Sequence, residues 1–268
     1  MAGFTTDGFL STEIADFERA IAARYSTKLQ LARDTNRLAH EIMYSIKPRN
    51  HHSTDLMLAS LLTRQASAFQ GFLILLNKGL ETQAQILLRN LVEMMFITGA
   101  IRKDETFIER YVLSEECSRL KSLEAIVRDK RSRREDIDSE TTRLIEELRE
   151  TIKREEPETF TTARIAEIAG LLSYYDNLYR FTSMAVHASP RELNSAFTVD
   201  GDGTVVSIRY EPTDDDLDMY LDYAVSVMLY ILHELASHFV LNFVDRIEAL
   251  QHANRESSGP TRTEAEKR

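Results

Sequence analysis

The sequence predicts an all-α protein, a multi-helix bundle of long antiparallel helices with one small β-hairpin at about residues 195–210. Apolar residues recur at helical spacing through several long stretches, which indicates amphipathic and core helices. The 268 residues include only nine Gly and five Pro, too few for a loop-rich β architecture. Two β-rich runs, Ala196–Val199 and Thr204–Tyr210, flank a pair of Asp-Gly steps, which is the chemistry of a tight hairpin turn.

The first half of the chain predicts four helices. The first is long and amphipathic and ends before Pro48, and the third is apolar almost all round, as expected at the centre of a bundle. The turn between the second and third contains Gly79, where a left-handed cap is expected. The predicted helices cover residues 11–46, 53–76, 81–101 and 104–130.

The composition changes at residues 128–158, where charged side chains dominate. We expect a charged helical insertion there, either a solvated hairpin or a basic handle for RNA. Shorter helices are expected at residues 162–168 and 172–187, and a long last helix from Asp216 to about Leu250. The predicted organisation is therefore one helical domain (1–127 and 159–252), the insertion (128–158) and a disordered tail (253–268).

The overall composition favours a cytoplasmic protein. The net charge of −10 argues against nonspecific coating of nucleic acid, although it leaves room for a local basic site. The single Cys117 cannot form an internal disulfide, and the N-terminus lacks a signal-peptide pattern. Residues 56–76 are interrupted by polar side chains, so no membrane span is expected. No motif calls for a metal or a cofactor, because the two histidines of His233-Glu234-Leu-Ala-Ser-His238 are five residues apart rather than four.

Polar residues interrupt two of the apolar helices. Arg89 and Glu93 are four residues apart and project from one face of the third helix. A charged pair in so apolar a run needs partners, so these residues form either a structural ion pair or half of a polar pocket.

The second interruption places Asp176, Arg180, Ser183 and His187 at steps of four, three and four, on one stripe of a helix. Histidine can move a proton near neutral pH, and arginine can stabilise a charged phosphate, so the stripe suits acid–base cleavage of a phosphodiester. In the competing interpretation, His187 ends the helix before Ser189-Pro190 and bonds its terminal carbonyls.

The motifs Leu88-Arg89-Asn90-Leu-Val-Glu93 and Tyr179-Arg180-Phe-Thr-Ser183, with the later His187, resemble those of a family of uncharacterised bacterial helical proteins. The resemblance covers about residues 60–250. It supports the helical fold and singles out Arg89, Glu93, Arg180, Ser183 and His187, but it implies no activity.

The spacing Arg180-x6-His187 also resembles the Arg-x4–6-His pattern of the HEPN superfamily. That resemblance implies a helical bundle acting as a metal-independent ribonuclease of a toxin or phage-defence system. Arg180 and His187 would then meet their counterparts across a homodimer, in a cleft that cuts RNA. Phe181 departs from the family, in which a polar residue commonly follows the arginine.

Two functional hypotheses follow. The first is a HEPN-like RNA endonuclease with Arg180, His187 and Ser183 as catalytic residues. The second is a non-catalytic binding or regulatory module with a buried Arg/Glu/His network. The substrate or ligand would lie against Arg89, Glu93, Asn90, Tyr179 and Asp176. The expected partners are RNA, a second copy of the chain, and a protein inhibitor or activator.

Overall fold

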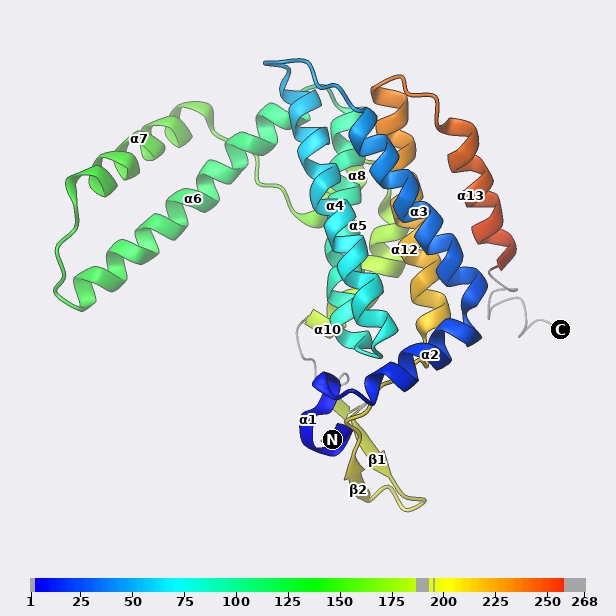
Figure 1. Cartoon of the computed structure of the whole chain (residues 1–268). Helices are drawn as coiled ribbons and strands as arrows, with labels where there is room; N and C mark the ends of the chain where they lie inside the picture. Colours follow the sequence, from blue (N-terminus) through cyan, green and yellow to red (C-terminus); the bar gives the residue numbers. More distant parts are fainter. Residues whose placement is uncertain (1–2, 187–192, 195, 258–268) are drawn as a thin grey trace.

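The computed structural model describes residues 3–186, 193–194 and 196–257. These residues form a mostly helical protein with one two-stranded antiparallel sheet, as the sequence predicts. Figure 1 shows a bundle of long helices, an arm of two helices that projects from one side, and a small hairpin below the bundle. The bundle is built around four helices: α3 (Ser26–Ser45), α4 (Ser53–Asn77), α5 (Glu81–Lys103) and α12 (Leu217–His238).

Helix α5 is the centre of the bundle, because it packs against α4 and α12 and also against α8 (Thr162–Ile168) and α10 (Arg180–Val186). Its side chains Leu88, Leu91 and Phe96 are fully buried. By length and composition α5 could cross a membrane, and it is the one such helix in the described part of the chain. Packing on several sides accounts for this apolar character.

The predicted first helix is two helices, α2 (Ile14–Arg24) and α3, with the break at Tyr25. The residues before and after Tyr25 favour a helix, so the sequence predicts one continuous helix there. That prediction was wrong, because contacts with a distant part of the chain interrupt the helix. The Tyr25 hydroxyl lies 3.2 Å from the Asp214 carboxylate, and Arg24 donates to the same carboxylate at 2.7 Å. These contacts turn α2 toward the segment that precedes α12. A short α1 (Phe4–Asp7) lies before α2.

The turn between α4 and α5 has the predicted glycine cap. Gly79 has a φ of +74°, and the amide of Leu80 donates to the Leu75 carbonyl at 3.0 Å, closing the last turn of α4. A Cβ at position 79 would lie 2.8 Å from the Cα of Pro212 and 2.8 Å from a ring carbon of Phe17. Both the backbone conformation and the space therefore require glycine.

Replacing Gly79 with alanine is expected to lower the free energy of unfolding by about 1–3 kcal/mol, because a left-handed alanine is strained and its Cβ meets backbone. Denaturant unfolding measures the effect. Gly201→Ala is the matched control, since a Cβ there meets nothing within 4 Å. Equal stability of the two variants would contradict the argument.

The predicted last helix is also two helices, α12 and α13 (Val244–Ser257). The chain turns at Val240, which has a φ of +53°, and the Leu241 amide donates to the Ala236 carbonyl at 2.9 Å. A β-branched residue rarely adopts this conformation, so the sequence offered no signal for the break. Helix α13 packs back against α12 and α3 and continues to Ser257, beyond the predicted boundary at residue 252.

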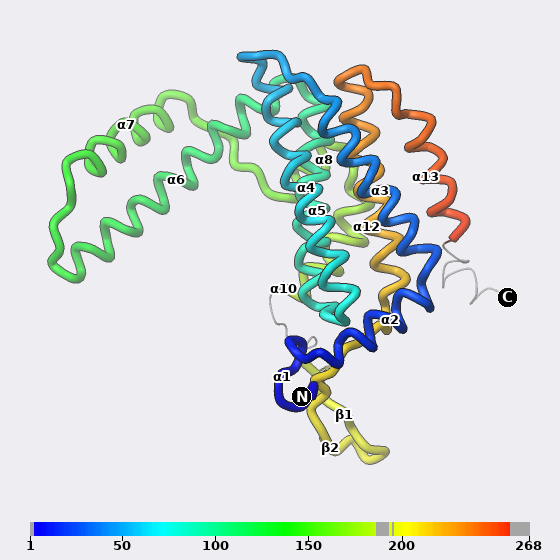
Figure 2. Tube along the Cα trace, in the orientation of Figure 1, coloured from blue at the N-terminus to red at the C-terminus, as the bar shows by residue number. Residues whose placement is uncertain are grey.

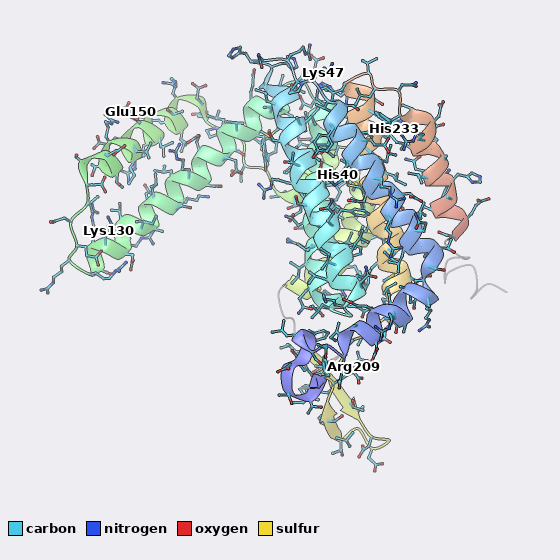
Figure 3. The ribbon with its side chains drawn as sticks, in the orientation of Figure 1. His40, Lys47, Lys130, Glu150, Arg209 and His233 are labelled. Carbon is cyan, nitrogen blue, oxygen red and sulfur yellow. The ribbon has the colours of Figure 1, made fainter. Side chains whose placement is uncertain are left out.

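The charged insertion lies in the projecting arm, which consists of α6 (Phe107–Ser132) and α7 (Ser139–Glu155). Figure 2 traces the two helices as an antiparallel pair, and in Figure 3 Lys130 lies at the end of the arm far from the bundle. Ile145 and Leu148 of α7 are buried against α6, while most other side chains of α7 face solvent.

The predicted helix at residues 172–187 is interrupted. A short α9 (Leu172–Tyr174) leads into a π-helical turn, Tyr175–Tyr179, and then into α10. The rings of Tyr175 and Tyr179 stack with centroids 5.1 Å apart. Such π-turns are common at functional sites because they reorient the side chains around them.

The hairpin consists of β1 (Phe197–Val199) and β2 (Val205–Ile208), with Phe197 paired to Ile208. The Asp200 carboxylate accepts hydrogen bonds from the amides of Asp202 and Thr204, at 3.0 and 2.8 Å, and so fixes the turn. The hairpin therefore lies where the sequence predicts it, and every residue of both strands is exposed.

Candidate functional site

The two polar interruptions of the sequence meet in the structure. Arg89 of α5 donates from Nε to the Ser183 hydroxyl at 3.1 Å and from Nη2 to the Tyr179 hydroxyl at 2.5 Å. The guanidinium carbon lies 4.7 Å from the centroid of the Tyr179 ring. Ser183 in turn donates to the Tyr179 carbonyl at 2.7 Å. These contacts fix the π-turn and α10 to α5.

Glu93 completes this cluster, which we call the Arg89 network (Arg89, Glu93, Tyr179 and Ser183). Oε1 of Glu93 accepts the Tyr179 hydroxyl at 3.0 Å and lies 3.1 Å from Nη2 of Arg89. The Tyr179 hydroxyl is also 3.4 Å from the hydroxyl of Thr162, which brings α8 to the network. The network thus connects three segments of the bundle.

The network is largely removed from water. The side chains of Arg89 and Glu93 are 20% and 29% exposed. Charges in such surroundings need each other and their hydrogen bonds, since a lone charge there would be costly. The structure therefore confirms that these residues are mutual partners, as both interpretations of the Arg89–Glu93 pair require.

The other predicted site residues do not join the network. Arg180 and Asp176 form an ion pair of 3.2 Å with each other, and their side chains are 66% and 60% exposed. Asn90 is half-buried, and none of the hydrogen bonds within the described residues joins it to Arg89. The predicted stripe is therefore divided, because Ser183 shares its face with Tyr179 while Arg180 points to solvent. His187 and the Ser189-Pro190 cap lie outside the described residues.

A pocket opens beside the network. Glu93 belongs to both, and Thr162, which lies against the Tyr179 hydroxyl, also lines the pocket. The pocket holds about 230 Å³. Its walls come from α5, α6, α8 and the segment before α8. They are lined by Glu93, Phe96, Ile97, Tyr111, Glu115, Phe160, Thr162 and Ile165. Because Phe96 is fully buried, we take its ring as the floor. We call this cavity the aromatic pocket.

The aromatic pocket is lined by two carboxylates, those of Glu93 and Glu115. Burial raises the pKa of Tyr111, and the nearby carboxylates of Glu115 and Glu93 raise it further, with Arg64 acting weakly in the opposite direction. The phenol therefore stays protonated and polar between two carboxylates. Glu115 is exposed and has no ion pair within the described part of the chain.

A larger cleft of about 470 Å³ lies at the start of α12. The half-buried Glu81 lines this cleft, and its carboxylate accepts the Thr213 hydroxyl at 2.7 Å and the Asp216 amide at 3.2 Å. Burial raises the pKa of Glu81 above its ordinary range. Both oxygens are used to hold the segment that begins α12, so we assign this carboxylate a structural role.

A second polar cluster lies at the far end of the bundle, and the sequence did not predict it. Asp55 at the start of α4 is 2% exposed, and its Oδ1 lies 2.8 Å from Nε2 of His238 in α12. Nδ1 of His238 lies 2.9 Å from Nη1 of Arg102, which can only donate. The proton of the imidazole is therefore on Nε2 and is donated to Asp55.

Asp55 also binds the segment before α4. Arg49 donates to it from the backbone amide at 2.9 Å and from the guanidinium at 2.8 and 2.9 Å. The pKa of Asp55 is far below its ordinary range, first because of the side-chain hydrogen bonds from Arg49 and then through the other bonds it accepts, against the effect of burial. Within the described residues, no group of three or more His, Cys, Asp or Glu side chains could hold a metal ion.

A family of unknown function, DUF5677, matches residues 55–204. The chain belongs to this family. The matched segment begins at the buried Asp55 and extends through the turn of the hairpin. It contains every residue of the Arg89 network and of the aromatic pocket, so the family shares the region in which both lie. No curated protein and no solved structure matches the chain.

Proposed function

We propose that this DUF5677 protein is a non-catalytic binding module, in which the Arg89 network holds α10 and the π-turn in place beside the aromatic pocket. The observation that carries the proposal is the mutual engagement of Arg89, Glu93 and Tyr179. Arg89 is bound to a carboxylate and two hydroxyls. Its charge and two of its donors are therefore already engaged within the protein and not directed at the phosphate of a substrate. A network of this kind fixes the position of helices and the rim of a pocket rather than performing acid–base chemistry.

The aromatic pocket supplies the ligand site of the proposed module. Three aromatic rings and two isoleucines line it together with two carboxylates and two hydroxyls, so it offers both apolar contact and polar groups to a small molecule. Glu93 links the two parts, since it borders the pocket and also holds Arg89 and Tyr179.

A second candidate is supported by Arg180, the one predicted catalytic residue whose described side chain is largely open to solvent. In that case the chain is a HEPN-like, metal-independent RNA endonuclease of a toxin or phage-defence system. Arg180 would bind the phosphate of RNA, His187 would move a proton, and a second copy of the chain would complete the cleft. A protein inhibitor or activator would control it.

One assay separates the two candidates: purified protein is incubated with total RNA in EDTA, beside Arg180→Ala and His187→Ala variants. The binding-module proposal expects intact RNA with the wild type and with both variants. Arg37→Ala is the control for nonspecific loss of RNA binding, since Arg37 is an exposed arginine of α3, outside the charged insertion. Cleavage by the wild type and Arg37→Ala that is lost in His187→Ala would overturn the binding module and assign the nuclease.

A further inference from the structure

We propose that the aromatic pocket binds a small organic ammonium cation, an alkylammonium or quaternary ammonium group. This inference rests on the proposed binding module and names the chemical class of its ligand.

The size of the pocket limits the ligand. Drug-sized ligands occupy sites of about 300–1,000 Å³, whereas the aromatic pocket holds about 230 Å³. A compact head group with a short tail fits this space, and an extended nucleotide does not.

The rings of the pocket suit a cation. Tyr111 and Phe160 both line the pocket, with ring centroids 6.2 Å apart and planes at 57°. Phe107 contacts both rings, with its centroid 5.3 Å from each. A cation within about 6 Å of such ring faces is attracted by their quadrupoles, and this is the way quaternary ammonium groups are recognised. The Arg110 guanidinium lies 5.6 Å from the Phe160 ring, and its charge is paired with the carboxylates of Asp104 and Glu158.

The charges of the pocket have the matching sign. Glu93 uses Oε1 for both Arg89 and Tyr179, and none of the hydrogen bonds within the described residues occupies its Oε2. Glu115 adds a second carboxylate from α6. An anion would meet these carboxylates unfavourably, so the pocket disfavours a small anionic ligand.

The donor set also disfavours a hard metal ion. Ca²⁺ takes about 6–8 oxygen ligands, and the pocket walls offer two carboxylates and two hydroxyls among apolar and aromatic groups. A poorly hydrated organic cation needs no such shell and gains from the apolar walls.

Isothermal titration of the full chain with choline tests the inference against 3,3-dimethylbutan-1-ol, its neutral carbon isostere. We expect choline to bind with a Kd below about 1 mM, and the isostere, which lacks only the charge, to bind at least about tenfold more weakly. Glu115→Gln should weaken choline binding about 2- to 5-fold, the range expected for an exposed carboxylate. Glu109→Gln, an exposed glutamate of the same helix, should bind choline as the wild type does. Phe160→Leu should also weaken binding, with circular dichroism as the check on its fold.

The possible outcomes separate the inference from the proposed function. Equal binding of choline and its isostere, or no binding of choline, overturns the ammonium inference. Binding of inorganic phosphate that is lost in Arg89→Met would likewise overturn it while leaving a binding module in place. RNA cleavage dependent on His187 would overturn the proposed function, while the choline titration would still report on the pocket by itself.

Discussion

Replacing Asp55 with alanine is expected to lower the free energy of unfolding by about 3–5 kcal/mol, the usual cost of removing one partner from a buried charged cluster. The side chain is 2% exposed and connects three parts of the chain: the segment before α4, α4 itself and the end of α12. Its loss leaves Arg49 and His238 without the carboxylate that both contact. Urea unfolding followed by circular dichroism measures the change.

The control for this experiment is Asp245→Ala. Asp245 also lies in the first turn of a helix, α13, but it is exposed. Its replacement should cost less than about 1 kcal/mol, through the helix dipole alone. If the two aspartate variants were equally stable, the buried cluster would contribute nothing and our account of the α4–α12 junction would be wrong.

The same carboxylate makes stability depend on pH in a definite direction. The pKa of Asp55 is lowered in the folded state, so the unfolded chain takes up a proton first as the solution is acidified. The contribution of Asp55 is therefore complete above about pH 5 and declines below about pH 4, the range in which an unfolded aspartate titrates. Between pH 6 and pH 3, the free energy of unfolding should fall more steeply for the wild type than for Asp55→Asn. The difference in slope should reach up to about 1.4 kcal/mol per pH unit.

The periodicity of apolar residues was enough to predict the helices of the bundle, because each helix buries a face or all of its surface. The positions of α4, α5 and α8 follow the sequence to within a few residues. The breaks at Tyr25 and Val240 could not be predicted in the same way. One depends on contacts with Asp214, far along the chain, and the other places a valine at positive φ.

In the candidate site, too, some residues could be predicted from the sequence and others could not. Arg89 and Glu93 could be found from the sequence because charges in an apolar helix require partners, and Tyr179 and Ser183 lie in the motif that supplies them. The aromatic pocket could not be found, since its rings come from α5, α6 and the segment before α8. Asp55 and His238 are 183 residues apart, and the run from His233 to His238 gave no sign of a carboxylate partner so far along the chain. Folding brings such groups together without leaving a pattern in the sequence.

The ion pair of the Arg89 network is expected to contribute to stability far more than an exposed pair of similar spacing. A double-mutant cycle with Arg89→Met, Glu93→Gln and the double variant should give a coupling energy of about 0.5–3 kcal/mol. The reason is the low exposure of the two side chains, 20% and 29%, and the Tyr179 hydroxyl that bridges them. Each single variant leaves a half-buried group without its partner, while the double variant removes both charges together.

The matched pair for this cycle is Asp176 and Arg180, which have the same spacing in sequence but are 60% and 66% exposed. Their coupling should stay below about 0.5 kcal/mol. Equal coupling in the two cycles would mean that the Arg89 network is no more than a surface ion pair. A large coupling confined to Arg89 and Glu93 would show that the partly buried network strengthens this pair beyond an exposed one. A ligand that contacts Glu93 would then compete with the Tyr179 hydroxyl for the same carboxylate, because Glu93 borders the pocket and also holds the π-turn through Tyr179.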